Sequence, residues 1–340
     1  MRGEALGVAG EGEMLLGVQH LSVGIKRRGT YYAAVDDISF KINPGEIVGI
    51  VGESGCGKSL TALSMLGLLP EGVQVRGGTI LFDGAELRGM SPQELCRIRG
   101  NEISMVFQEP MTSLNPLIKI GRQIAEPLEL HGWKNKQRIY DAVRAIMGKV
   151  GLPEPEALMA AYPHQLSGGM RQRVMIALAV VCKPKLLIAD EPTTALDVTI
   201  QAQILHLMKW INQDLGTSIL FISHDLAVIS RLCDRVLVMY AGKLVEEGTV
   251  QAVFQHPLHE YTKGLIGSIP NKGQKGTPLV NIPGKVPSIQ EKSSGCPFAP
   301  RCFRAEPRCF AAFPAPRSCN DHWVCCALAD HPVRLHCKES

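Results

Sequence analysis

Apolar residues in this chain fall into two kinds of segment that alternate along it. Short runs such as 47–51 and 186–189 are almost wholly apolar, and the second is typical of a strand inside a parallel sheet. Longer segments repeat apolar residues every three or four positions, as at 117–152 and at 200–215, where Gly216 ends the pattern. Because strands and helices alternate, the pattern predicts an α/β core.

The two ends of the chain differ from this core in composition. Residues 1–13 are rich in Gly and Glu, and we expect a flexible tail there. After about Tyr261, residues 270–295 carry many Pro, Gly, Lys and Ser and are typical of a linker. The Cys- and Pro-rich residues that follow are too few to hold a shape without a metal or another staple. We therefore expect a main domain at 14–262 and an extension at 263–340.

Composition excludes some classes of function. The chain has 340 residues, 45% of them hydrophobic, so it can bury an ordinary globular core. Its formal net charge of +4 is too small and too dispersed to indicate nucleic-acid binding. No apolar run is long enough to cross a bilayer, and the first residues lack the apolar stretch of a signal peptide. We therefore expect a cytoplasmic protein.

Residues 52–59 carry the strongest chemical signal, because they spell the phosphate-loop pattern G-x-x-x-x-G-K-S between an apolar run and a potential helix at 60–69. The glycines allow successive backbone N–H groups to point at phosphate oxygens. Lys58 can reach the β- and γ-phosphates, and Ser59 can ligate Mg²⁺. A Gly-rich turn that matches by chance is the alternative, but the full motif in this context favours nucleotide binding.

Two carboxylates follow the apolar run at 186–189, where ligands of open α/β folds bind. Asp190 is suited to hold Mg²⁺, directly or through water. Glu191 is suited to act as general base on the attacking water. A solvated acidic turn would be the better interpretation if the phosphate loop were absent upstream.

Residues 166–172 offer a second anion-binding helix start, with Ser167 as the N-cap and Gly168 and Gly169 behind it. An ordinary capped helix is the alternative. Since one chain rarely needs two such sites for one γ-phosphate, the simplest functional interpretation is that the second site faces a nucleotide held by a partner subunit.

Together these motifs resemble the ATP-binding subunit of an ABC transporter over roughly residues 14–262. The resemblance assigns, in chain order, Walker A (52–59), the Q-loop glutamine (Gln108), the signature (166–172), Walker B (186–191), the D-loop (195–197) and the switch histidine (His224). It implies a P-loop ATPase core with an antiparallel β subdomain and a helical signature subdomain. It also implies a head-to-tail dimer that sandwiches ATP.

The resemblance further implies a role for each site residue. The catalytic group would be Lys58, Gln108, Glu191 and His224, and Mg²⁺ would be held by Ser59, Gln108 and Asp190. ATP would contact Tyr32 (Tyr31 is the alternative), Gly52, Ser54, Gly55, Gly57, Lys58, Ser59, Leu60, Ser167, Gly168, Gly169, Asp190 and Asp197. Residues 109–116 would relay the state of the γ-phosphate to membrane subunits.

Several stretches are similar to the dipeptide/oligopeptide importer subfamily, in particular to the first of its two ATPase subunits: 108–116, 190–203, 256–262, 282–287 and 295–302. This resemblance implies an ATPase that energises peptide import at the cytoplasmic face of the inner membrane. Its partners would be a paralogous second ATPase subunit, two membrane permease subunits and a peptide-binding protein. Nickel or another small solute is an alternative cargo. A soluble ABC ATPase acting on ribosomes or DNA, or an exporter subunit, is a less favoured alternative.

Seven of the eleven cysteines lie between Cys296 and Cys337. In a reducing cytoplasm such a cluster favours a metal over disulfides. The spacing C-x5-C-x6-C contains no C-x2-C pair, which weakens a zinc-ribbon interpretation. The family pattern implies a structural [4Fe–4S] cluster on Cys296, Cys302, Cys309 and Cys326, with Cys325 or Cys319 as other candidates for the fourth ligand. Structural zinc and unmetallated thiols remain as alternatives.

Overall fold

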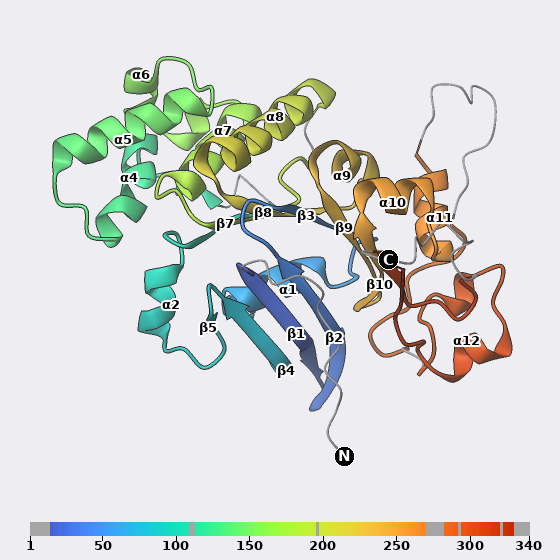
Figure 1. Cartoon of the computed structure of the whole chain (residues 1–340). Coiled ribbons are helices and arrows are strands. Elements are labelled where there is room, and N and C mark those ends of the chain that lie inside the picture. The colour runs from blue at the N-terminus through green and yellow to red at the C-terminus, as the bar shows by residue number, and fades with distance from the viewer. Residues whose placement is uncertain are drawn as a thin grey trace, which may run out of the picture.

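A computed structural model describes residues 14–108, 113–194, 197–269, 282–291, 294–319 and 322–329. The predicted tail at 1–13 and most of the predicted linker lie outside these ranges. Within them, the strands form two sheets with helices around them (Figure 1). The predicted α/β core is confirmed.

The larger sheet has, in the described residues, eight strands in the order β11-β12-β10-β9-β3-β8-β7-β6. Its centre, from β9 to β6, is parallel, while β10, β12 and β11 are added antiparallel at one edge. The strands are β3 (Ile47–Val51), β6 (Ile103–Val106), β7 (Leu186–Asp190), β8 (Ser218–Ser223), β9 (Arg235–Tyr240), β10 (Lys243–Thr249), β11 (Arg317–Cys319) and β12 (His322–Val324). The carboxyl ends of β3, β6, β7 and β8 therefore meet at one edge.

The smaller sheet is antiparallel and has the order β2-β1-β4-β5 in the part of the chain that the structure describes. Its strands are β1 (Leu16–Arg27), β2 (Thr30–Ile42), β4 (Val73–Phe82) and β5 (Ala85–Glu86). Burial alternates at the end of β2, where Ile38, Phe40 and Ile42 are buried and Ser39 is exposed, because one face packs on the core and the other faces water. This sheet is the antiparallel subdomain that the sequence resemblance implied.

Helices cover the larger sheet and form a separate lobe beside it, in which α4, α5 and α6 gather next to α7 (Figure 1). The helices are α1 (Lys58–Met65), α2 (Pro92–Ile98), α4 (Ile120–Leu130), α5 (Lys136–Lys149), α6 (Pro155–Met159), α7 (Gly168–Val180), α8 (Val198–Leu215), α9 (Leu226–Leu232), α10 (Val250–Gln255), α11 (Glu260–Gly267) and α12 (Pro307–Ala311), with the short 3-10 turns η1 (Pro163–Gln165) and η2 (Ala299–Arg301). Among the described residues, no helix combines the length and the apolar character needed to cross a bilayer.

Two apolar clusters hold these layers together, one on each face of the larger sheet. Successive residues of β7 alternate between them: Leu186 and Ile188 join the cluster that includes the small sheet, and Leu187 and Ala189 join the one beneath the helices. All four side chains are buried, as the wholly apolar run predicted. The strand thereby fixes Asp190 and the residue after it at the sheet edge.

Candidate active site

The phosphate loop runs from the end of β3 to the start of α1, and the surrounding residues leave no room for a side chain at Gly52 or Gly57. A Cβ atom built at Gly52 would overlap the carbonyl oxygen of Met239. Gly57 has a φ of 108°, which disfavours residues with a side chain, and it is the N-cap of α1. Since no side chain caps this helix, the N–H groups of its first turn, which include those of Ser59 and Leu60, lack a capping acceptor. Such amides suit phosphate oxygens.

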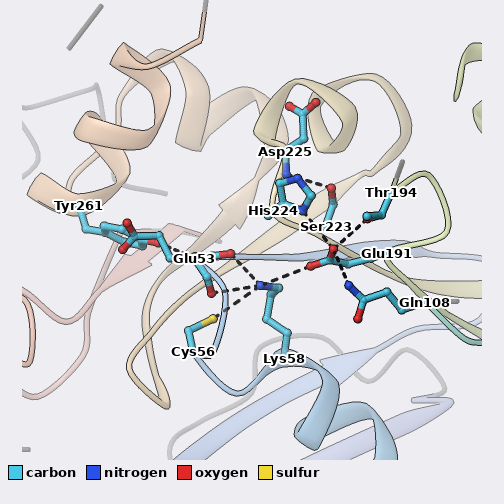
Figure 2. A network of polar contacts seen from close by, with 11 residues as sticks. Glu53, Cys56, Lys58, Gln108, Glu191, Thr194, Ser223, His224, Asp225 and Tyr261 are labelled. Atoms are coloured by element: carbon cyan, nitrogen blue, oxygen red, sulfur yellow. Dashed lines mark hydrogen bonds and ion pairs between the residues drawn. The ribbon is translucent and has the colours of Figure 1, made fainter. Parts of the chain in front are cut away.

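Lys58 lies across the loop and is almost wholly buried, with 5% of its surface exposed. Its Nζ donates to the carbonyl oxygens of Gly52 at 2.7 Å and Glu53 at 3.2 Å, and it lies 3.9 Å from Oε1 of Glu191 (Figure 2). Buried ammonium groups need such partners. Phosphate oxygens could replace the carbonyls, since the amine already stands at the mouth of the loop.

Asp190 ends β7 and is 4% exposed. Burial raises the pKa of its carboxyl group, and the nearby Glu191 adds to this rise, while a hydrogen bond with Ser59 and the charge of Lys58 oppose it. Its Oδ1 is a buried oxygen with no hydrogen-bond partner in the described structure. A buried oxygen without a partner is costly unless a cation completes it. The pair Asp190 and Ser59 therefore fits Mg²⁺.

Glu191 follows Asp190 with φ at 47°, in the left-handed region that a residue with a side chain rarely adopts. This conformation turns its carboxylate toward three donors: Oε2 accepts from Thr194 Oγ1 at 2.9 Å and Gln108 Nε2 at 3.3 Å, and it lies 3.1 Å from His224 Nδ1. Since an ionised carboxylate only accepts, Nδ1 of His224 carries the proton. Figure 2 shows these side chains converging. The structure thus brings together all four predicted catalytic residues.

The signature residues lie at the start of α7 and not on the strand ends that carry this cluster of contacts. Ser167 is the N-cap of α7, as predicted, and its side chain accepts from the N–H of Met170 at 3.3 Å. Ser167 and Gly168 are exposed, so they are accessible to another chain. Asp197 caps α8 by accepting from the N–H of Ile200 at 2.9 Å. The D-loop residues 195–196 lie outside the described ranges, as do 109–112 of the predicted relay segment.

The two tyrosines considered for adenine have different surroundings. Arg76 lies over the ring of Tyr31, with its Cζ 4.5 Å from the ring centroid, and the hydroxyl donates to Gln74. Tyr32 is half-buried on β2, which approaches the phosphate loop two residues later at Ala34. Because Arg76 occupies a face of Tyr31, Tyr32 is the better candidate for stacking.

Two family models match this chain. The model described as "ABC transporter" matches residues 35–194, and "Oligopeptide/dipeptide transporter, C-terminal region" matches residues 245–309. The oligopeptide transport ATP-binding protein OppD of Haemophilus influenzae is 48% identical over 295 residues, which cover 87% of this chain and 91% of that protein. The dipeptide transport ATP-binding protein DppD of Bacillus subtilis is 47% identical over 320 residues, covering 94% and 96%.

The chain belongs to the oligopeptide/dipeptide family of ABC transporter ATP-binding subunits. Solved structures agree with this family. The dimeric ATP-binding cassette MJ0796, bound to ADP and Pi, has a TM-score of 0.63 at 26% identity and covers 69% of this chain and 98% of its own. CbiO1 of Clostridium perfringens has a TM-score of 0.62 at 28% identity, covering 72% and 92%. This ABC subunit is therefore an ATPase with the cassette fold.

Sequence reasoning missed three residues of the site. Thr194 bonds the Glu191 carboxylate, and its position three residues after Glu191 was the available signal. Glu53 is a variable position of the phosphate-loop pattern, which assigns it no role, although a charged side chain there needs a partner. Arg301 supplies that partner from 248 positions away, a contact that no local pattern could indicate.

The iron–sulfur prediction for this ABC subunit is wrong. Cys296, Cys302, Cys309 and Cys326 do line one cavity, but it measures only about 20 Å³ and is also walled by apolar side chains such as Phe298. Across the described ranges, no group of three or more His, Cys, Asp or Glu residues could hold a metal ion. The same finding excludes zinc on these residues.

The physical reason is that burial favours the neutral thiol at three of these cysteines, Cys296, Cys302 and Cys326. Burial raises the pKa of Cys296 to about 11 and also raises those of Cys302 and Cys326, whereas metal ligation requires thiolates. Cys325, the alternative ligand, is buried too, and burial raises its pKa to about 12. The described cysteines here are free thiols. The Cys319 side chain and Cys337 lie outside what the structure describes.

Proposed function

We propose that this subunit hydrolyses ATP to energise the import of dipeptides or oligopeptides. The observation that carries the proposal is the convergence of Lys58, Gln108 and His224 on Glu191, in a chain 48% identical to an oligopeptide transport ATP-binding protein. A hydrolytic base, a phosphate-binding amine and a γ-phosphate sensor thereby stand at one sheet edge. This arrangement supports catalysis rather than nucleotide storage.

The chemistry follows from the positions of these groups. The phosphates of ATP would accept hydrogen bonds from the loop amides. They would also attract Lys58 away from the carbonyl oxygens that it now contacts. Ser59 and Asp190 would hold Mg²⁺, which neutralises phosphate charge when bound, with Gln108 as a further ligand. Glu191 would then accept a proton from the attacking water, with His224 orienting that water at the γ-phosphate.

We propose that a second ATPase subunit, paralogous to this one, completes each ATP site. The supporting observation is that Ser167 and Gly168 are exposed at the start of α7, where another chain can reach them. In a head-to-tail dimer, these residues together with Gly169 and Asp197 would face the partner's ATP. Tyr32 would stack on the adenine of the subunit's own ATP.

We propose that two membrane permeases dock beside the Q-loop at the cytoplasmic face of the inner membrane, and that a peptide-binding protein delivers cargo to them. Large apolar side chains are exposed on both sides of the relay segment: Phe107 is 42% exposed and Leu117 is 84% exposed. Large exposed apolar side chains that flank one segment favour a protein contact there. The proposed units are a tail at 1–13, an ATPase domain at 14–262 and a C-terminal extension at 263–340.

The test is reconstitution of the transporter. The tagged chain is purified from membranes, its partners are identified, and the complex is placed in liposomes with the binding protein. We expect two permeases and a second ATPase subunit, and peptide-loaded binding protein should raise phosphate release several-fold while Glu191→Gln abolishes it. Stimulation by a nickel chelate but not by peptide would contradict the proposed cargo. A chain that recovers no permease would contradict the importer role.

A further inference from the structure

The described residues after 281, here called the C-terminal segment, contact the phosphate loop through a partly buried ion pair. Arg301, in η2, donates from Nη1 to Glu53 Oε2 at 2.6 Å and from Nη2 to Glu53 Oε1 at 3.1 Å, a two-pronged contact. The Arg301 side chain is only 6% exposed. Its Nη1 also donates to Tyr240 Oη at 3.1 Å, and its Nε to the carbonyl of Pro283 at 2.7 Å. Paired, planar contacts of this kind fix a carboxylate in position.

A second contact joins the same loop residue to α11. The backbone N–H of Glu53 donates to Tyr261 Oη at 2.8 Å (Figure 2). Tyr261 is fully buried and packs edge-on against Tyr240, with ring centroids 4.7 Å apart, and Phe298 of the C-terminal segment lies 5.4 Å from its ring. This aromatic packing fixes the position of the Tyr261 hydroxyl, to which the loop is bonded.

Glu53 is thus tied at three points. Its carboxylate binds Arg301, its N–H binds Tyr261, and its carbonyl oxygen accepts from Lys58. Two of these ties come from outside the segment that carries the phosphate loop. They fix the backbone at the position where the loop leaves β3.

The negative charge of Glu53 lies within the loop that would bind the phosphates of ATP. A free carboxylate within the loop would repel the phosphates of ATP, with little screening between charges a few ångströms apart in a partly buried site. Arg301 both neutralises this carboxylate and holds it to the side that faces the C-terminal segment.

We propose that Arg301 of the C-terminal segment and Tyr261 of α11 are positioning residues for ATP binding, which fix the phosphate loop and keep the Glu53 carboxylate away from the nucleotide. This proposal rests on ATP binding at residues 52–59. The segment then sets the affinity of the cassette for ATP, beyond adding strands to its sheet.

Full-length variants test this proposal by titration with a fluorescent ATP analogue and by steady-state hydrolysis. Arg301→Ala should weaken ATP binding about tenfold and raise KM for ATP with kcat little changed, because it removes a charge-assisted contact and frees the carboxylate. Tyr261→Phe should weaken binding by a smaller factor. Glu53→Gln should bind ATP about as tightly as wild type, and the double variant Glu53→Gln/Arg301→Ala should recover most of the lost affinity.

Arg304→Ala is the matched control. Arg304 joins the same segment to α11 by donating from Nη1 to Glu260 Oε1 at 3.0 Å, whereas Arg301 donates to Glu53. It should change thermal stability as Arg301→Ala does but leave the ATP affinity unchanged. Equal affinity losses in the two arginine variants, or a double variant as weak as Arg301→Ala, would overturn the proposal. A wild-type chain that bound no ATP would instead overturn nucleotide binding itself, and with it this inference.

A second readout does not depend on affinity. Cys56 is buried within the phosphate loop and its carbonyl oxygen accepts from Gly242. If Arg301 steadies the loop, alkylation of Cys56 without nucleotide, followed by mass spectrometry of its peptide, should be several-fold faster in Arg301→Ala than in Arg304→Ala. Equal rates would count against the proposal even if both variants fold less stably.

Discussion

Glu191 joins three segments of the chain through one carboxylate. Gln108 follows β6, Thr194 follows Glu191 itself after β7, and His224 follows β8, so the ends of three neighbouring parallel strands meet at this side chain. The left-handed backbone conformation of Glu191 is strained, and it directs the carboxylate toward these three side chains. Strain of this kind persists only where surrounding contacts determine it.

Replacement of Glu191 by Gln separates binding from hydrolysis. The amide has nearly the same shape but cannot accept a proton at neutral pH, so phosphate release should fall about 10²- to 10⁴-fold. ATP affinity should stay within a few-fold of wild type, because the loop amides and Lys58 are untouched. Single-turnover phosphate release and an ATP titration measure the two quantities, and unchanged turnover would contradict the assignment of the base.

Asp190 makes a prediction about the metal. Its unpartnered Oδ1 fits a cation, so Asp190→Asn should raise the Mg²⁺ concentration for half-maximal hydrolysis about tenfold or more, because one ligand charge is lost. The control is Asp214→Asn, which removes an exposed carboxylate from α8. An unchanged Mg²⁺ requirement in Asp190→Asn would contradict a role for this carboxylate in metal binding.

At the scale of elements, the sequence predicted the strands and helices that follow from hydrophobic periodicity and from capping residues. The buried strand β7, the helix α8 with its left-handed Gly216 cap, and the Ser167 cap of α7 all lie where the pattern put them, because burial and capping are local requirements. The resemblance likewise assigned Gln108, Glu191 and His224 to one ATP site, and the fold brings them together because parallel strands share one carboxyl edge.

Other features depend on contacts that no local pattern records. The strand β10 and the short strand β12 pair only because residues some 76 positions apart come together, as when Trp323 donates to Glu247. The cysteine cluster failed as a metal site for the opposite reason. Its spacing matched a family pattern, but the apolar surroundings that the fold supplies favour neutral thiols.

The start of α11 makes stability depend on pH. His259 is its N-cap: Nδ1 accepts from the N–H of Tyr261, which requires the neutral ring. Burial lowers the pKa of His259 from 6.5 to about 4, although the charges of Glu246 and Glu260 oppose the shift. The unfolded chain therefore binds the proton more readily between these two values, and folding stability falls as the pH drops through that window, by up to about 3 kcal/mol.

Urea unfolding at pH 7.5 and pH 5 measures this effect. His259→Asn keeps an oxygen that can cap the helix but removes the titrating group, so its stability should change less between the two pH values than that of wild type. An equal change in both proteins would assign the pH dependence to other groups.

At the scale of the whole molecule, the two halves of the proposed composite site lie in different parts of one chain. The phosphate loop, Asp190 and Glu191 lie at the edge of the large sheet, while the start of α7 belongs to the helical lobe beside it (Figure 1). A single subunit can therefore bind ATP with one surface and leave the signature for another chain. ATP binding and hydrolysis should thus respond differently to changes at Gly168.

Gly168→Asp tests this division. No atom lies within 4 Å of a Cβ built at Gly168, so the side chain fits the folded subunit, yet it places a negative charge where the partner's γ-phosphate is expected. We expect ATP affinity of the isolated subunit to stay near wild type, while hydrolysis by the assembled pair falls at least tenfold because like charges repel across the closed site. Gly148→Asp, at an equally open helical position in α5, is the matched control and should leave hydrolysis unchanged.

Light scattering of each pair with ATP, under conditions that block hydrolysis, should show a dimer for Gly148→Asp and separate subunits for Gly168→Asp. If both variants close equally well, the start of α7 does not face a partner's nucleotide, and the composite site must be built from another surface.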